Sequence, residues 1–249
     1  MPHTPKDVPY CFHAGGHAFS AHFVRPVDVP IAAQAATSLP PIGGFAHSRV
    51  EDFAVSRLAS FKVGETHVAG SWEEPTIVTT SATAILEDLC VLDFLTVDKI
   101  VCRLSARYEE NGKHQESQIM ALGSYFENLR LGGFKVEVTL RHNLLVDAQN
   151  FAHLTKSLKG DKHAVVRHGV AFFSLVDKIV VDKGLEELHG FKKHGNRLVV
   201  PNFGKIALAE VVATPGSVSL TMLRFKLGSP DGGGGSGGTT HTNGLPPPP

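Results

Sequence analysis

Residues 48–63, SRVEDFAVSRLASFKV, alternate between apolar and polar side chains. Five residues at odd positions share one face of an extended chain: Phe53, Val55, Ala59, Phe61 and Val63. Only Arg57 interrupts this face, while Ser60 and Lys62 lie on the opposite one. A period of two residues predicts a half-buried β-strand.

Further segments of this kind follow along the chain, rich in Val, Ile, Leu, Thr and Phe. Turn signals separate them, among them Glu-Asn-Gly at 110–112, Gly-Gly at 132–133 and Pro-Gly at 215–216. Many short strands at spacings near ten residues are typical of an antiparallel sandwich or flattened barrel. We therefore expect one mostly-β domain over residues 10–228.

One segment has a helical period instead. Its apolar positions are Leu144, Leu145, Ala148, Phe151, Ala152, Thr155 and Leu158. This spacing predicts an amphipathic helix over about 143–159, ended by Gly160, which covers the β body. A second, single-turn helix is expected within 184–191.

Residues 229–249 consist mainly of Gly, Pro and Thr and carry little charge or apolar surface. Such a composition predicts a disordered tail, because it cannot bury enough surface to fold. The run GGGGSGG resembles a passive flexible linker, and the final PPPP could contact a proline-reading partner.

Lys plus Arg equals Asp plus Glu at 24 each, so the formal net charge is zero. This balance gives no electrostatic reason to expect nucleic acid or an anionic membrane as a partner. No apolar run reaches the roughly 18 residues of a membrane-spanning helix, and residues 1–16 lack the features of a secretory signal. A cytoplasmic location with three reduced cysteines is therefore expected.

Three related hexapeptides occur at 50–55 (VEDFAV), 86–91 (LEDLCV) and 126–131 (FENLRL). If their strands were neighbours, Glu51, Glu87 and Glu127 could form a ladder that holds Ca²⁺. The alternative is structural: a polar strand entry followed by inward apolar residues. The pentapeptide VDKIV also occurs twice, at 97–101 and 176–180, which indicates related hairpins.

His13, His17 and His22 lie close together in sequence near Cys11. Three imidazoles could bind Zn²⁺ or copper and leave one coordination position for water. Strand alternation argues against this site, because it places His17 and His22 on opposite faces. Histidines that bond to backbone or solvent are the alternative. No sequence motif of a common hydrolase, phosphate-binding loop or metalloprotease is present.

The phrase TSATAILEDLCVLDFLTVDKIVCRLSARY (80–108), followed by GSYFENLRLGGFKVEV (123–138), resembles the bacterial choice-of-anchor domains. The resemblance rests on Ala84, Leu86, Leu89, Val91, Leu95, Val97, Asp98 and Ile100, then on Gly123, Ser124, Phe126, Asn128, Leu129 and Gly133. It implies a β-rich, non-enzymatic module of exported bacterial proteins. It carries over no catalytic residue, and the chain lacks the signal and anchor segments of that pattern.

Together these features favour a non-enzymatic binding or structural module that self-associates through sheet edges or an apolar face. The alternative is a β-barrel metal-dependent enzyme or small-ligand carrier, lined by His13, His17 and His22.

Overall fold

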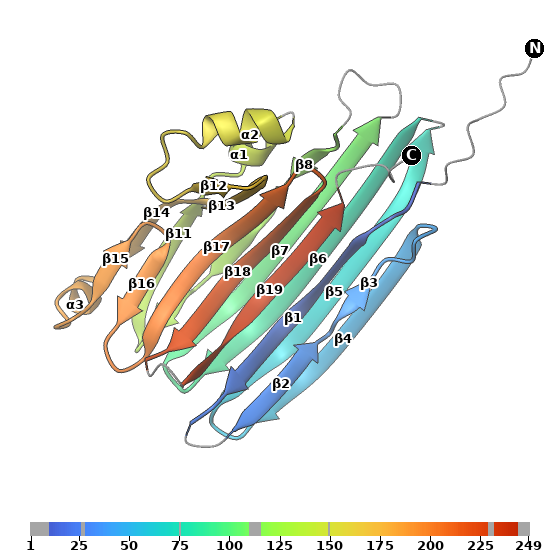
Figure 1. Cartoon of the computed structure of the whole chain (residues 1–249). Helices are drawn as coiled ribbons and strands as arrows, with labels where there is room; N and C mark the ends of the chain where they lie inside the picture. The colour runs from blue at the N-terminus through green and yellow to red at the C-terminus, as the bar shows by residue number, and fades with distance from the viewer. Residues whose placement is uncertain are drawn as a thin grey trace, which may run out of the picture.

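The computed structural model describes residues 10–25, 28–74, 76–109, 116–148, 150–228 and 232–243. Two antiparallel β-sheets pack face to face (Figure 1). The prediction of a mostly-β sandwich is confirmed, and the sheets do not close into a barrel. Within the described ranges, no helix has the length and apolar character that crossing a membrane requires.

Sheet A contains ten strands, in the order β12-β13-β17-β18-β19-β1-β2, with β15 and β16 beside β17 and β3 beside β1. Their bounds are β1 Ala14–Phe23, β2 Val29–Gln34, β3 Thr37–Ser38, β12 Val165–Arg167, β13 Val170–Ser174, β15 Lys192–His194, β16 Arg197–Val200, β17 Gly204–Thr214, β18 Ser217–Leu227 and β19 Gly233–Asn243.

Sheet B contains nine strands, in the order β14-β11-β10-β7-β6-β5-β4, with β8 and β9 beside β7. Their bounds are β4 Gly44–Val55, β5 Ala59–Glu74, β6 Ile77–Val91, β7 Leu95–Glu109, β8 Gln118–Met120, β9 Tyr125–Glu127, β10 Arg130–Leu131, β11 Phe134–Leu140 and β14 Val176–Val181.

The prediction of one continuous helix over 143–159 is wrong. Two short helices occur there, α1 (Asn143–Val146) and α2 (Phe151–Ser157). Asn150 interrupts them because its backbone is extended and its side chain accepts a hydrogen bond from His153 N at 2.8 Å. A short third helix, α3, spans Lys183–Glu186, where a single turn was expected.

The predicted disorder of the C-terminal segment is wrong for residues 233–243. They form β19, which lies inside sheet A and pairs with β18 on one side and β1 on the other. Glycine is needed here because the neighbours leave no room: a Cβ on Gly235 would lie 2.7 Å from Ala21 Cβ and from Phe225 Cζ. The other residues of the expected tail, including PPPP, lie outside the described residues.

The stretch 48–63 is a hairpin rather than one strand, because β4 and β5 meet at a turn over 56–58. Phe53 and Phe61 face each other across it and stack at 4.8 Å between ring centroids. Val63, predicted on the same face, lies on the outer face instead. The strict alternation assumed for this stretch is therefore wrong near Asp52.

Side-chain alternation in sheet B reverses along one row, here called the break row. On four successive strands two adjacent residues point outward: Glu51–Asp52, Lys62–Val63, Glu87–Asp88 and Asp98–Lys99. The strand register aligns these pairs across the sheet. The register skips positions at this row and continues on both sides of it, because the four strands reverse their alternation at the same level.

The break row explains the repeated hexapeptides. Asp52, Asp88 and Asn128 all have positive φ, at 49°, 53° and 49°. Asp and Asn tolerate this left-handed conformation better than most residues, which is why Asn can stand in the third copy. The position at a strand entry is wrong, because Asp52 and Asp88 lie well inside β4 and β6. The inward apolar residues are confirmed for the second and third copies, where Leu89, Val91, Leu129 and Leu131 are buried.

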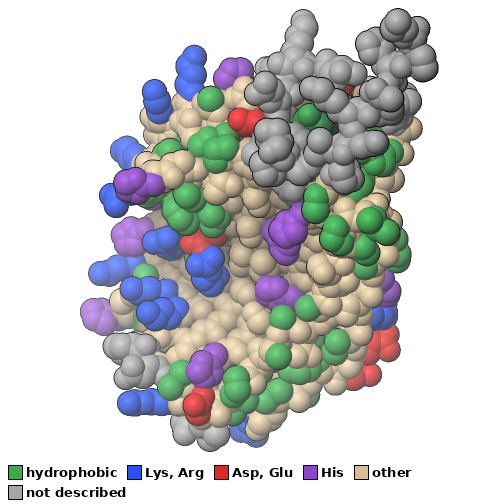
Figure 2. Space-filling model, turned by 45° about the vertical axis from the view of Figure 1, so that its right-hand side comes forward, with side chains coloured by type: hydrophobic (Ala, Val, Ile, Leu, Met, Phe, Trp, Pro, Cys, Tyr) green, Lys and Arg blue, Asp and Glu red, His purple; other side chains and the backbone are tan. Residues whose placement is uncertain are grey.

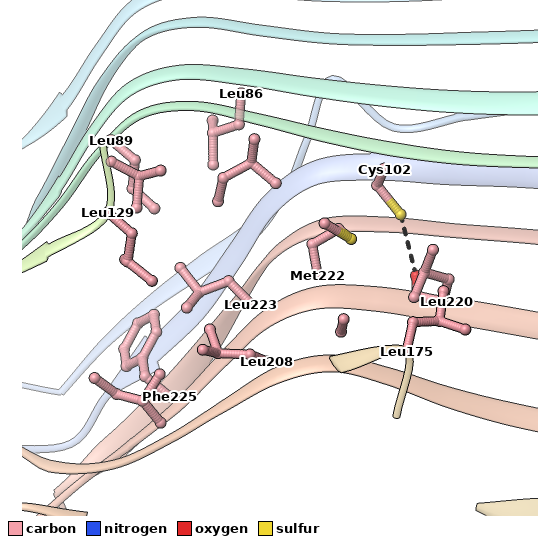
Figure 3. Close-up of a cluster of buried hydrophobic side chains, with 14 of the residues drawn as sticks. Leu86, Leu89, Cys102, Leu129, Leu175, Leu208, Leu220, Met222, Leu223 and Phe225 are labelled. Carbon is pink, nitrogen blue, oxygen red and sulfur yellow. Dashed lines mark hydrogen bonds between the residues drawn. The ribbon is translucent and has the colours of Figure 1, made fainter. Parts of the chain in front are cut away.

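The core between the sheets is apolar and densely filled (Figure 3). Leucines from both sheets meet there, together with Met222 and Phe225. Cys102 is buried among them, with its Sγ 3.4 Å from the Leu220 carbonyl oxygen and 3.2 Å from Thr240 Oγ1. Burial raises the pKa of this thiol to about 12, so it behaves as a small hydrophobic side chain.

Candidate functional site: the basic face of sheet A

Charged residues are distributed unequally between the two sheets. The strands of sheet A contain seven basic residues and one acidic residue, Glu210; the basic ones are Arg167, Lys192, Lys193, Arg197, Lys205, Arg224 and Lys226. The strands of sheet B contain eight basic residues, Arg49, Lys62, Lys99, Arg103, Arg107, Arg130, Lys135 and Lys178. They also contain twelve acidic ones: Glu51, Asp52, Glu65, Glu73, Glu74, Glu87, Asp88, Asp98, Glu109, Glu127, Glu137 and Asp177.

Four of the basic residues, Arg197, Lys205, Arg224 and Lys226, form what we call the basic face. They come from β16, β17 and β18, and the strand register places Lys205 directly beside Lys226. Within the described residues neither of these two lysines forms an ion pair. Two like charges side by side repel each other, and an anionic ligand would relieve that repulsion.

Glu210 is the counter-charge of the two arginines. Its carboxylate is 3.4 Å from Arg197 and 3.1 Å from Arg224. Both guanidinium groups remain exposed, at 69% and 55% of their side-chain surface. One carboxylate shared by two arginines leaves excess positive charge on this part of the sheet.

A hollow beside β1, β18 and β19 includes Arg224 and Lys226 of the basic face in its lining, together with the apolar residues Ala21, Val24, Ile31 and Phe225. Gly234 and Gly235 contribute no side chains to it, and Ser20 and Ser236 line it with hydroxyl groups. Figure 2 shows Lys and Arg side chains gathered along the left of the view, beside this hollowed stretch of backbone and small side chains. The surface offers charge, hydroxyl groups and exposed backbone together.

His17 connects the hollow with the rest of the outer face. Its Nε2 lies 3.2 Å from Ser20 Oγ and 3.4 Å from Ser236 Oγ, and the two hydroxyls are 3.1 Å apart. Burial lowers the pKa of His17, so the neutral ring is favoured. No carboxylate contacts this ring among the described residues, so the cluster lacks the third member of a hydrolytic triad.

His241 on β19 extends the row of histidines. Its ring stacks obliquely on His13, with centroids 5.0 Å apart. Burial lowers the pKa of His241, and the nearby His13 and His17 lower it further. Sequence patterns could not have found His241, because it lies in the segment expected to be disordered.

The three histidines predicted as a metal site do not converge. The break in alternation near Ala18 turns His17 and His22 to the same outer face, so the predicted opposite orientation is wrong. His22 instead bonds to Asp28, with Nε2 2.5 Å from Oδ1. Within the described ranges, His13, His17 and His22 do not come close enough together to share a metal ion.

The predicted acidic ladder is only partly formed. Glu51, Glu87 and Glu127 do lie in one row of sheet B, but Val63 separates the first two and Lys99 separates the last two. Lys99 Nζ is 2.7 Å from Glu87 Oε1 and supplies a positive charge there. The row therefore lacks a point at which the three carboxylates converge on a cation.

Sequence reasoning missed the basic face for a simple reason. Its residues occur singly in three strands, at alternate positions such as Arg224 and Lys226, and nowhere form a cluster of consecutive charges. The overall charge of zero also concealed it. Only the pairing of β16, β17 and β18 brings the residues together.

No curated protein and no solved structure matches the chain. A family model matches residues 10–164, which include β1 to α2 and end before β15–β18. This match does not bear on the choice-of-anchor resemblance, which stays a prediction. Because the match covers more than half of the chain, the chain belongs to the family described as Domain of unknown function (DUF8256).

Proposed function

We propose that this protein is a non-enzymatic binding module whose basic face binds an acidic polysaccharide. The observation that carries the proposal is the charge distribution of sheet A, whose strands hold seven basic residues against one acidic residue. Lys205 and Lys226 lie side by side without an acidic partner among the described residues. A polyanion would gain several weak charge contacts at once, and its counterions would be released.

The hollow favours a carbohydrate over a nucleic acid. Hydroxyl groups of Ser20 and Ser236 and the open backbone of Gly234 suit a ligand rich in hydroxyl groups. Binding of single-stranded nucleic acid commonly uses exposed aromatic rings on which bases stack. Among the Phe, Tyr and Trp residues in the described strands of sheet A, the exposed one is Phe172, on β13, outside the rows of the basic face.

The test is equilibrium binding of heparin, used as an acidic polysaccharide probe, to the full chain. The double variant Lys205→Glu/Lys226→Glu should weaken binding about tenfold or more, because two attractions become repulsions. The matched control, Lys135→Glu/Lys178→Glu, makes the same change in charge on sheet B and should bind like the wild type. Binding should also weaken steadily as salt concentration rises.

Two results would overturn the proposal. The first is an equal loss of affinity in the control variant, which would mean that only net charge matters. The second is tighter binding of single-stranded DNA than of heparin at the same salt concentration, which would favour a nucleic-acid ligand. Circular dichroism of each variant checks that the fold is retained.

A second function, self-association, is favoured by one observation. Strand β4 has twelve residues and pairs only with β5 among the described residues, so its other edge offers free backbone groups. A long open edge is a template for pairing with another chain. Light scattering over a concentration series should then report a dimer, and a monomer at every concentration would contradict this proposal.

A further inference from the structure

A separate cluster of metal-binding side chains lies on the outer side of sheet B, on the β4–β5 hairpin. His47 and His67 are direct cross-strand partners, and Glu65 is two residues from His67 on the same strand. The two imidazole rings stack at 4.3 Å between centroids, with only 10° between their planes. Ligand atoms of all three residues lie within 4.8 Å of one another.

The three polar groups point at one spot. Nε2 of His47 and Nε2 of His67 each lie 2.9 Å from the same carboxylate oxygen, Glu65 Oε1. Two imidazole nitrogens and one carboxylate oxygen form a ligand set that suits Zn²⁺ and related transition metals. We propose that His47, Glu65 and His67 bind one divalent transition-metal ion of the Zn²⁺ class, independently of the basic face.

The sheet supports this site in two ways. Adjacent antiparallel strands hold the two histidines opposite each other, so little conformational entropy is lost when they bind. Phe45, the next outward residue on β4, stacks beside both rings, at 6.4 Å from His47 and 6.1 Å from His67. Three protein ligands would leave a fourth position open for water or another ligand.

Glu65 contacts Arg49 as well as the two histidines. Burial raises the pKa of this carboxyl, but the hydrogen bond from His47 and the charges of His67 and Arg49 outweigh that effect. Together these neighbours hold the pKa of the Glu65 carboxyl below its ordinary value. Its second oxygen, Oε2, accepts a hydrogen bond from Arg49 at 3.3 Å.

Arg49 is the group that opposes metal binding. Its guanidinium bridges Glu65 and Glu51 and places a positive charge beside the site. Removing that charge should strengthen the binding of a cation, whereas a purely structural cluster would show no such effect. Loss of Arg49 should therefore strengthen metal binding, whereas loss of a metal ligand should weaken it, so Arg49 is a useful probe of the proposal.

The experiment is calorimetric titration of the metal-free full chain with Zn²⁺, together with Co²⁺ absorption spectra. One equivalent should bind to the wild type, and the double variant His47→Ala/His67→Ala should lose this saturable binding. Arg49→Met should bind several-fold more tightly. The control His22→Ala removes a different exposed histidine that is paired with a carboxylate, and it should bind one equivalent like the wild type.

Three outcomes would overturn the proposal: no saturable binding by the wild type, unchanged binding by the double variant, or an equal loss in His22→Ala. Because all four residues are at least partly exposed, the variants should keep the fold, and thermal unfolding monitored by circular dichroism checks this. Heparin binding is measured in parallel and should not change, so failure of this site is distinct from failure of the basic face.

Discussion

The outer faces of the two sheets contain the same residue types but arrange their charges differently. On sheet B each of several basic residues lies next to an acid: Lys99 with Glu87, and Lys135 with Glu137. On sheet A, Lys205 lies next to Lys226 instead. The formal net charge of zero therefore conceals an excess of positive charge on the strands of sheet A, which acidic residues of sheet B and of the rest of the chain balance.

The two faces are therefore suited to different ligands. Paired charges on sheet B contribute little to long-range attraction and leave local sites such as the His47–Glu65–His67 cluster. Excess charge on sheet A can attract an extended polyanion. The variants below test the strand packing and the charge arrangement that produce this contrast. They are given from the largest expected effect to the smallest.

The largest effect is expected for Gly235→Ala, in the centre of sheet A. The new Cβ would lie 2.6 Å from Ser20 O and 2.7 Å from Phe225 Cζ, so strands β1 and β18 must move apart. Overpacking of this kind costs about 1–3 kcal/mol of unfolding free energy. Gly160→Ala, where no atom is within 4 Å of the added carbon, is the control. Chemical denaturation measures both, and equal stabilities would show that β19 is not packed as described.

Asp88→Ala tests the break row of sheet B. Asp88 has φ of 53°, and alanine is less tolerant of that conformation, so we expect a loss of about 1 kcal/mol. Asp88→Asn should be nearly neutral, as in the third hexapeptide. A loss for Asn as large as that for Ala would mean that the carboxylate, rather than the backbone, matters at this position. Urea unfolding curves measure the difference.

A smaller effect is expected for Glu210→Gln, which removes the one acidic residue in the strands of sheet A. Arg197 and Arg224 would then lose their shared counter-charge. Heparin affinity should rise about two- to fivefold, the range expected for one exposed ion pair. The same substitution at Glu137, beside Lys135 on sheet B, should leave affinity unchanged. Weaker binding by Glu210→Gln would contradict the role given to sheet A.

The smallest effect concerns pH. Burial lowers the pKa of His17 and His241 below 6.5 in the fold, so the unfolded chain binds protons on them more readily. The stability that they contribute is fully present above pH 6.5 and is lost as pH falls below it. His17→Gln/His241→Gln should therefore lose less thermal stability than the wild type between about pH 7.5 and 5.5. An equal loss in both proteins would contradict this assignment.

The fold class followed from the sequence because alternation is a local property. The period of two in residues 48–63 predicted strands correctly, although the turn at 56–58 and the reversal at Asp52 were missed. Both errors have one cause: a residue with positive φ changes the face of every side chain that follows it. Alternation alone does not reveal where such a residue lies.

The remaining features depend on contacts between distant segments. β19 has the composition of a linker, and it is a strand only because β1 and β18 provide partners on both sides. The metal-binding cluster was missed because His47 and His67 are twenty positions apart and meet only across the hairpin. A helical period over 143–159 also could not reveal that Asn150 caps a new helix.

Contact between an acidic polysaccharide and the basic face of sheet A can be mapped residue by residue. The most direct measurement is acetylation of lysines in the wild-type chain, with and without heparin, read by mass spectrometry. We expect heparin to protect Lys205 and Lys226, whereas Lys135 and Lys178 on sheet B should react equally in both samples. Protection of Lys135 and Lys178, or equal reactivity of all four lysines, would contradict this prediction.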